Sequence, residues 1–589
     1  MVEQPAGASP PPRRGLSRLL PWLVIPLILG ALVFEQTRLF RESTCETYDE
    51  FTYLRMGICI FRDGDFPSLA SPMCPPLPIL LEYWLPALQA KFIPGTADWE
   101  RAVPAMTRQA RLLTSVTLGV PLVVLVFAWL TLRRGWIIGA IGGGLLAGSP
   151  TFLAAASVAT TDACFALFGV VALVGLRHHL ARRSRWSYLL AGGGIGLALG
   201  SKQSAAIFFV VALVELILEE FPQRRPGGTA VDRALRFGWR VATRWGGLVA
   251  LAFLVTWGLY GFRLARFGAT GTTSTIPVII PMVANLFAQS DAIMEVVRQY
   301  GLPLSYDTFI GQMQHAAQGH AAFLMGAHSR QGWWYFFPVA IAIKSTPAEL
   351  VALALALGLA CRPVTWRDPS RRLWLGASLT LLGAGMASSI NIGQRYMLLI
   401  YPLAILLAAD WLGERAARFR TRAIVAGCLL LTWQGVSAVG IAPHYLSYFN
   451  SFCGGPMAGY RYLVDSSLDW GQDLPALRRE LEARGYRQVA LCYFGTAQAA
   501  NYGLRAIDWK TTDAAEAARC DYLAISATAV QGAYGTSADF NARFQAFPST
   551  RAGYSIFVYD LKDPRIRAAW DTIRLPSPPV LNESSEPKQ

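Results

Sequence analysis

The chain has 589 residues, of which 53% are hydrophobic and 15% are charged, and its mean hydropathy is +0.34. Soluble proteins carry about 25% charged residues, so this composition excludes an ordinary soluble protein and favours an integral membrane protein. The formal net charge of +15 does not indicate nucleic-acid binding, because the arginines cluster in short loops between apolar segments instead of forming a continuous basic surface.

The N-terminal segment 1–15 is polar, basic and rich in proline, and we expect it to be a disordered cytoplasmic tail. An apolar run from Leu19 to Phe34 follows it. This run is longer than the core of a signal peptide and has no small-residue cleavage site after it, so the sequence predicts a first membrane-spanning helix that is retained. Arg13 and Arg14 place the N-terminus inside by the positive-inside rule.

Apolar runs recur over residues 16–441, and we expect about eleven membrane-spanning helices in this part of the chain. With this number, every arginine-rich loop falls on the cytoplasmic side, as the positive-inside rule requires. The spans expected after the first lie near residues 109–132, 136–156, 163–177, 187–200, 204–219, 246–266, 346–361, 373–389, 396–412 and 422–441. Two long loops, 41–106 and 267–332, are predicted on the outer face.

The composition changes to that of a soluble domain after the last predicted span. We therefore assign residues 442–575 to a small α/β domain on the outer face. A helical pattern over residues 474–484 precedes three strand-like runs, QVALCYFG, DYLAIS and YSIFVYDL, which together are typical of a sheet packed against helices. Residues 576–589 are polar and rich in proline, which predicts a disordered tail.

Acidic residues at the outer ends of the spans are candidates for chemistry, because ionisable groups beside apolar helices are costly. Asp49 and Glu50 in TYDEFTYLRMG follow the first span directly. Two adjacent acids can supply a general base or hold a cation, although a solvated helix start explains them equally well. Spacing alone favours Asp162 as a helix N-cap with Thr160 and Thr161, and a functional acid is the alternative.

Basic residues near the same face are candidates for binding an anion. Lys202 and Lys344 lie between or within apolar runs, where a lysine pairs with an acid or phosphate, or extends to the interface. Arg395 in NIGQRYMLLIYP begins a span at its outer end, where the positive-inside rule does not favour arginine. A guanidinium binds phosphate through two hydrogen bonds, so we favour phosphate binding over an aromatic-belt anchor with Tyr396 and Tyr401.

Other patterns carry little weight. GGGIGLALG has glycines spaced like a dinucleotide-binding loop, but it lies inside a predicted span, where close helix packing explains it better. His315, His320 and His328 share a loop without the spacing of zinc ligands. Asp63 and Asp65 form a DxD that is an isolated tripeptide.

Taken together, these segments resemble the family-39-like GT-C glycosyltransferases, the bacterial relatives of protein O-mannosyltransferases and of the aminoarabinose transferase that acts on lipid A. The resemblance runs from Tyr48 to about Gly495 and rests on YDEFTYLRMG, CPPLP, ATTDACFALF, GSKQSA, GWWYFFPVAIAIKSTP, NIGQRYMLLIYP and YFNSFCGGPMAGYRYLVDSSLDWGQDL, in this order. It implies a GT-C fold and an enzyme that moves one sugar from a polyprenyl-phosphate lipid to a glycan, lipid or protein hydroxyl.

The resemblance also implies roles for the polar residues. Asp49 would be the general base with Glu50 as its support, and Asp162 and Tyr396 would line the same cavity. The donor phosphate would be bound by three cations: Lys202, Arg395 and, as the weaker candidate, Lys344. Direct displacement with inversion at the sugar is expected, and a divalent metal is compatible with this chemistry but not required. The protein would then lie in a bacterial inner membrane with its site on the extracytoplasmic side.

Two departures from the family bear on the acceptor. The family often has a histidine before the paired prolines, where this chain has Cys74, so the type of acceptor stays open if that histidine contacts it. The run WWYFFP lacks the aspartate of the WWDYG motif of oligosaccharyltransferases, so we do not infer transfer of a whole oligosaccharide to asparagine.

Two other classes of protein compete with an enzyme. A transporter or flippase of lipid-linked sugars commonly has inverted repeats and polar residues deep in the membrane, whereas the sequence has no internal repeat and its polar candidates lie at the outer face. A non-catalytic scaffold that presents the C-terminal domain would not need acids and cations gathered at that face.

Overall fold

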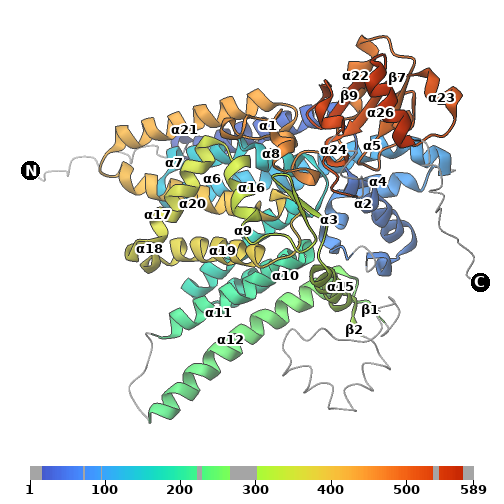
Figure 1. Ribbon diagram of the computed structural model, residues 1–589. Coiled ribbons are helices and arrows are strands. Elements are labelled where there is room, and N and C mark those ends of the chain that lie inside the picture. Colours follow the sequence, from blue (N-terminus) through green and yellow to red (C-terminus); the bar gives the residue numbers. More distant parts are fainter. Residues whose placement is uncertain are drawn as a thin grey trace, which may run out of the picture.

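The computed structural model describes residues 16–69, 73–93, 96–221, 229–265, 302–534 and 543–574. The predicted tails 1–15 and 576–589, and residues 267–301 of the second predicted loop, lie outside these ranges. Helices make up most of the described chain and lie side by side in one large body, with a sheet at one end of it (Figure 1).

A helix, or a pair of helices, occupies most of each segment that the sequence predicts to span the membrane, and in the segment 246–266 the helix ends at Leu259. Among the described residues, five helices are long and apolar enough to cross a membrane, or six if a bent pair counts as one span. The five are Leu19–Ser43, Asp98–Arg134, Thr161–Arg182, Ala230–Leu259 and Arg420–Ile441, and the bent pair is Trp136–Ala147 with Pro150–Ser157. The other predicted spans are shorter or less apolar helices, so the total of eleven stays a prediction.

The elements of this part are the helices α1 (Leu16–Ser43), α2 (Tyr48–Ile58), α3 (Pro76–Glu82), α4 (Trp84–Ala90), α5 (Thr96–Thr114), α6 (Val120–Arg134), α7 (Trp136–Ala147), α8 (Pro150–Ser157), α9 (Thr161–Arg182), α10 (Arg185–Ser201), α11 (Ile207–Glu220), α12 (Ala230–Leu259), α15 (Leu304–Gln318), α16 (Phe336–Lys344), α17 (Pro347–Ala360), α18 (Pro363–Arg367), α19 (Pro369–Met386), α20 (Ile400–Ala416) and α21 (Arg420–Ile441), with the short strands β1 (Leu264–Ala265), β2 (Leu302–Pro303), β3 (Ala322–Leu324) and β4 (Ala327–Ser329).

Helices α7 and α8 meet at an angle of 65°, where the sequence predicts one span over 136–156. Gly148 ends α7, Ser149 accepts a hydrogen bond of 3.1 Å from the Phe152 N–H, and Pro150 occupies the first turn of α8. A capping serine followed by proline is a strong start for a new helix, so the local sequence itself causes the break. The turn that follows α8, residues 158–160, is buried inside the protein.

Helices α9 and α10 pack with their backbones in close approach. A Cβ atom placed on Gly194 would lie 2.9 Å from Ala172 Cα, and one on Gly175 would lie 2.7 Å from the Leu190 carbonyl oxygen. Only glycine leaves enough room for such contacts. The prediction that GGGIGLALG serves helix packing is therefore confirmed.

A buried cluster of ion pairs joins α6, α19 and α20. The Asp410 carboxylate accepts hydrogen bonds from Arg133 Nε at 2.5 Å, Arg134 Nε at 2.7 Å and Arg371 Nε at 2.6 Å. Buried charges are tolerated when they are paired and hydrogen-bonded in this way. The cluster brings together arginines from two loops that the sequence predicts on the same side of the membrane.

The C-terminal part contains a five-stranded sheet in the order β6-β5-β7-β9-β8. β5 is parallel to β6 and β7, whereas β9 is antiparallel to β7 and β8. The three predicted strand-like runs correspond to β5, β7 and β9. The elements are α22 (Leu474–Ala483), β5 (Gln488–Cys492), β6 (Ala506–Asp508), α23 (Ala514–Arg519), β7 (Cys520–Ser526), α24 (Ala527–Val530), β8 (Thr550–Ala552), β9 (Ile556–Asp560) and α26 (Pro564–Arg574).

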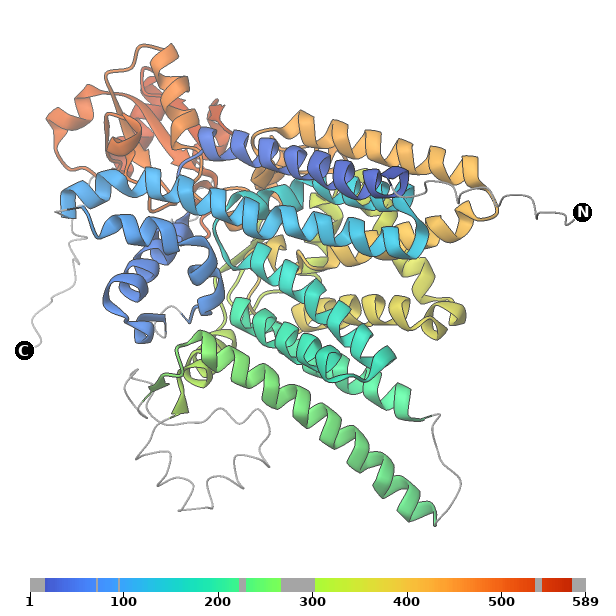
Figure 2. The same ribbon diagram turned by 180° about the vertical axis from the view of Figure 1, so that it is seen from behind.

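Residues 465–473, DSSLDWGQD, connect the sheet to the helical body, and we call them the junction segment. Its Trp470 carbonyl accepts a hydrogen bond of 2.9 Å from the Tyr48 N–H of α2. Its Asp469 accepts one of 2.8 Å from the Thr528 N–H of α24. The junction segment is buried throughout, so it fixes the sheet beside α2 and α5, as seen from behind in Figure 2.

Candidate functional site

A cavity of about 560 Å³ lies among α2, α15 and α19 and the turns that precede α11 and α20. Asp49, Lys202 and Arg395 form a charged part of its wall. Other parts of the wall are apolar, with the side chains of Ile207, Phe337, Leu381, Ile392 and Met397. The cavity is therefore suited to a ligand with one anionic part and one apolar part.

Four side chains that the sequence singles out lie in one row of alternating charge. Arg395 is in the middle, with Nη2 at 3.2 Å from Asp49 Oδ2 and Nη1 at 3.3 Å from Asp162 Oδ2. Lys202 Nζ lies 2.6 Å from the other oxygen of Asp162. The predicted residues are thus brought together from four distant parts of the chain.

Local structure explains why these four side chains meet. Asp49 and Asp162 lie in the first turns of α2 and α9, where the helix dipole favours an acid. Lys202 follows the last residue of α10 in an extended conformation, and Arg395 lies in a short 3₁₀ turn just before α20. Two helix starts and two interhelical turns therefore provide the acids and the cations.

Aromatic rings hold the two cations. Lys202 Nζ lies 3.9 Å from the centre of the Tyr396 ring, and the Arg395 guanidinium lies 4.0 Å from the centre of the Trp470 ring. Such cation–π contacts contribute about 0.5–2 kcal/mol. The prediction that Tyr396 lies at the cavity agrees with its position in the wall. Trp470 was not predicted as an individual site residue.

The interpretation of Asp162 as an N-cap is wrong. Thr160 is the N-cap residue of α9, and its side chain makes no capping hydrogen bond. The Asp162 carboxylate is buried and accepts hydrogen bonds from Lys202 and Arg395 instead. A buried carboxylate needs cationic partners more than it needs a backbone N–H. Asp162 is not among the residues that line the large cavity, and its role as a functional acid stays a prediction.

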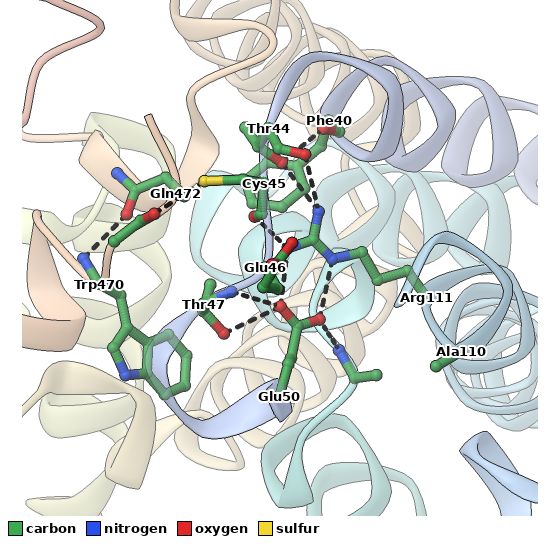
Figure 3. Close-up of polar contacts among 12 residues, drawn as sticks. Phe40, Thr44, Cys45, Glu46, Thr47, Glu50, Ala110, Arg111, Trp470 and Gln472 are labelled. Carbon is green, nitrogen blue, oxygen red and sulfur yellow. Dashed lines mark hydrogen bonds and ion pairs between the residues drawn. The ribbon is translucent and has the colours of Figure 1, made fainter. Parts of the chain in front are cut away.

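Glu50 lies outside the wall of the large cavity, although it follows Asp49 in sequence. Arg111 donates to it from Nε at 2.8 Å and from Nη2 at 2.7 Å, and the Ala159 N–H donates at 2.9 Å. The Thr47 N–H donates to the same carboxylate at 2.7 Å, as Figure 3 shows. Glu50 therefore makes structural contacts beneath Asp49 and does not line the large cavity, and its expected role as the support of Asp49 in catalysis stays a prediction.

Lys344 lies deeper than the other two cations. Its Nζ donates a hydrogen bond of 2.7 Å to the Leu446 carbonyl and another to the Ser467 carbonyl. It lines a second cavity of about 30 Å³, which Arg395 and Asp162 also line. Lys344 is thus near the row but faces the junction segment, and its predicted contact with the donor phosphate remains a prediction.

The environment of Asp49 is suited to proton transfer. Burial raises the pKa of its carboxyl, and the positive charge and hydrogen bond of Arg395 oppose this rise. A general base is most effective when its pKa is close to the working pH. Asp49 combines a raised pKa with a place in the cavity wall.

The DxD of Asp63 and Asp65 and the three loop histidines, to which the sequence gives little weight, do not form a common site in the structure. Asp63 forms an exposed ion pair with its neighbour Arg62, and His315 alone of the three loop histidines lines the large cavity. Within the part of the chain that the structure describes, no group of three His, Cys, Asp or Glu side chains is arranged to hold a metal ion. All nine cysteines are free thiols.

Residues 106–226 match the family model of dolichyl-phosphate-mannose-protein mannosyltransferases. This range includes Asp162 and Lys202 and confirms, over its length, the resemblance seen in the sequence. No curated protein sequence matches the chain.

Two solved structures illustrate the structural similarity. ArnT from Cupriavidus metallidurans, bound to undecaprenyl phosphate, is 12% identical, and the match covers 91% of this chain and 97% of that chain with a TM-score of 0.43. The archaeal oligosaccharyltransferase AglB from Archaeoglobus fulgidus, in complex with an inhibitory peptide and a dolichol-phosphate, is also 12% identical, with 86% and 70% covered and a TM-score of 0.43.

Proposed function

We propose that this protein is a glycosyltransferase that moves a single sugar from a polyprenyl-phosphate donor to an acceptor hydroxyl. The family match over residues 106–226 supports this class of reaction. The observation that carries the proposal is the row of Asp49, Arg395, Asp162 and Lys202, of which Asp49, Arg395 and Lys202 line the large cavity. A base and two cations at one cavity are what such a transfer requires.

The donor would be held by charge at one end and by apolar contacts along its chain. Lys202 and Arg395 would bind the phosphate, and the apolar wall near Phe337 and Leu381 would contact the first part of the lipid. Arg395 Nη2 lies 3.2 Å from Asp49 Oδ2. A phosphate that attracts Arg395 would weaken this ion pair, so donor binding would free Asp49 to act as the base.

The reaction would proceed by one displacement. Asp49 takes the proton of the acceptor hydroxyl while that oxygen attacks the anomeric carbon of the donor sugar. The bond between the anomeric carbon and the phosphate oxygen breaks, and polyprenyl phosphate leaves with its charge neutralised by Lys202 and Arg395. Attack from the side opposite the phosphate inverts the anomeric configuration. General base catalysis contributes about 10²–10⁴-fold, and cations near the leaving group contribute further.

The membrane would be a bacterial inner membrane, with the site on its extracytoplasmic side. Eleven crossings with the N-terminus inside would place α2, the junction segment and the sheet together outside. The arginines that cluster around Asp410 would lie at the cytoplasmic ends of their helices, as the positive-inside rule favours.

The test uses purified protein in lipid vesicles with radiolabelled polyprenyl-phosphate hexoses. We expect sugar transfer or slow donor hydrolysis by the wild type, a loss of about 10²–10⁴-fold in Asp49→Asn, and weaker donor binding in Arg395→Gln. Asp63→Asn is the matched control, since Asp63 is also paired with an arginine but is exposed. Equal turnover in all four proteins would contradict the assigned site. Movement of intact donor across the vesicle without cleavage would favour a transporter.

A further inference from the structure

Five of the described aromatic rings follow one another from one side of the large cavity to another. Tyr48 stacks on Phe494 with centres 5.4 Å apart, and Phe494 stacks on Tyr534 at 5.2 Å. The edge of His320 meets Tyr534 at 5.8 Å, and His315 lies 5.5 Å from His320. We call these five residues the ring arc. It begins next to Asp49 and ends at His315, and both of these residues line the cavity.

Two of the five rings of the ring arc are exposed to solvent, and the other three, His315, His320 and Phe494, are half-buried. Tyr48 is 45% exposed and Tyr534 is 42% exposed. Rings that served only to join the sheet to the helical body would be expected to lie under cover, as Tyr83 and Trp374 do in the core. An exposed aromatic surface that continues a cavity is a typical binding surface.

The rings are held in place before any ligand arrives. The Tyr48 N–H donates to the Trp470 carbonyl at 2.9 Å, and the Tyr48 carbonyl accepts a hydrogen bond of 3.3 Å from Thr496 Oγ1. The Tyr534 hydroxyl donates to Asp465, a buried residue of the junction segment. A surface fixed in this way loses little freedom on binding, which favours affinity.

The ring arc shares its support with the charged row. The junction segment holds Tyr534 through Asp465 and covers Arg395 with Trp470. Tyr48 is the residue directly before Asp49 at the start of α2. A molecule that lay along the rings would therefore have its end near the start of α2, where Asp49 lies.

We propose that the ring arc is the acceptor site and that the acceptor is a carbohydrate; this inference rests on the proposed function. The C–H face of a sugar ring packs against an aromatic face, and the edges of tyrosine and histidine offer hydrogen-bonding groups to sugar hydroxyls. A succession of rings suits a succession of sugar units. The unit over Tyr48 presents its hydroxyl to Asp49, and the units beyond it contact Phe494, Tyr534 and His320.

The test measures binding without the donor, by saturation-transfer NMR on the full chain in nanodiscs. The probes are a linear hexose oligosaccharide and a peptide rich in serine and threonine. We expect saturation of the oligosaccharide and about 5- to 10-fold weaker binding in Tyr48→Leu and in Tyr534→Leu. Tyr48→Phe, which keeps the ring and loses only the hydroxyl, should weaken binding less than Tyr48→Leu does. Phe452→Leu is the control, since Phe452 is 80% exposed and lies outside the ring arc.

Two results would overturn the inference. One is saturation of the peptide with none of the oligosaccharide, which would make the acceptor a protein. The other is oligosaccharide binding that is equal in the wild type and in both leucine variants, provided that these variants melt at the wild-type temperature. If one variant fails to fold, the other decides.

Failure of the ring arc can be told apart from failure of the proposed function. One outcome is that the wild type hydrolyses the donor but oligosaccharide binding does not depend on Tyr48 or Tyr534. This outcome would refute the acceptor site at the ring arc and support the proposed enzyme. The other outcome is that oligosaccharide binding depends on these rings but the protein never cleaves a donor. This outcome would support the carbohydrate site at the ring arc and refute the proposed enzyme.

Discussion

Asp49 is subject to two opposing influences on its protonation. Burial raises the pKa of the carboxyl above the value of about 3.9 for a free aspartate, and Arg395 lowers it again. A general base must be ionised, so activity should be lost as the pH falls through this raised pKa. We expect the acidic limb of the rate profile to lie at a higher pH than a free aspartate would give.

Removal of the arginine should shift that limb in a defined direction. In Arg395→Gln the opposing positive charge is gone, so the pKa of Asp49 rises further and less of the base is ionised at any given pH. The measurement is the pH dependence of donor hydrolysis in the wild type and in the variant. An acidic limb that stays in place or moves to lower pH would show that Asp49 is not the titrating base.

The pair of Glu50 and Arg111 gives a prediction about stability. Both side chains are buried and make several hydrogen bonds to each other and to the backbone of residues 44–47. Glu50→Gln leaves the Arg111 charge without its partner, which should destabilise the fold by about 3–5 kcal/mol. The measurement is thermal unfolding in detergent.

Asp63→Asn provides the comparison for that experiment. It removes an exposed ion pair with Arg62, and such pairs contribute about 0–1 kcal/mol. Equal melting temperatures in Glu50→Gln and Asp63→Asn would mean that the buried pair contributes no more than an exposed one.

At the scale of residues, the sequence predicts the members of the charged row but not all of their partners. Asp49, Asp162, Lys202 and Arg395 are recognisable because charges at the ends of apolar helices are costly and so mark function. Glu50 is misleading, because consecutive residues of a helix point about 100° apart. Its partner Arg111 comes from a distant helix, and contacts of this kind have no local pattern in the sequence.

The close packing of α9 against α10 leads to a prediction with a neighbouring control. Gly194→Ala should push the helices apart, because its Cβ would lie 2.9 Å from Ala172 Cα, and we expect a loss of about 1–3 kcal/mol from overpacking. Gly193→Ala should be neutral or stabilise the helix by up to about 1 kcal/mol, because a Cβ there meets no atom within 4 Å. The comparison uses melting temperatures. A lower melting temperature in Gly193→Ala than in Gly194→Ala would contradict it.

The sequence predicts long elements better than short ones. Apolar runs identify the helices because a membrane segment must bury its backbone groups in helical hydrogen bonds. Ser149 and Pro150 indicate the bend between α7 and α8. The bend was not predicted because the residues on both sides of it are apolar and together have the length of one span. Strands β6 and β8 have three residues each, which is too short for an alternating pattern to be seen.

The site depends on parts of the chain that are far apart. Substitution of Trp470 tests whether the junction segment contributes to donor binding. Loss of its ring in Trp470→Leu removes a cation–π contact with Arg395 of about 0.5–2 kcal/mol. We expect KM for the donor to rise by about 3- to 10-fold with a smaller change in kcat, because the guanidinium is less well placed for the phosphate. Trp334→Leu is the control, since Trp334 is 65% exposed. An unchanged KM in Trp470→Leu would show that Trp470 does not position Arg395 for the donor.

Under the proposed function, the junction segment would complete the site late in the synthesis of the protein. Asp49 emerges early from the ribosome, whereas Trp470, which covers Arg395, emerges after the last predicted span. Chains grow at about 5–20 residues per second, so the membrane helices are inserted well before the site is complete. A nascent chain would hold its base and its cations without the junction that fixes them. Under the proposed function, donor lipid in the surrounding membrane would not be cleaved until the soluble end of the protein has folded.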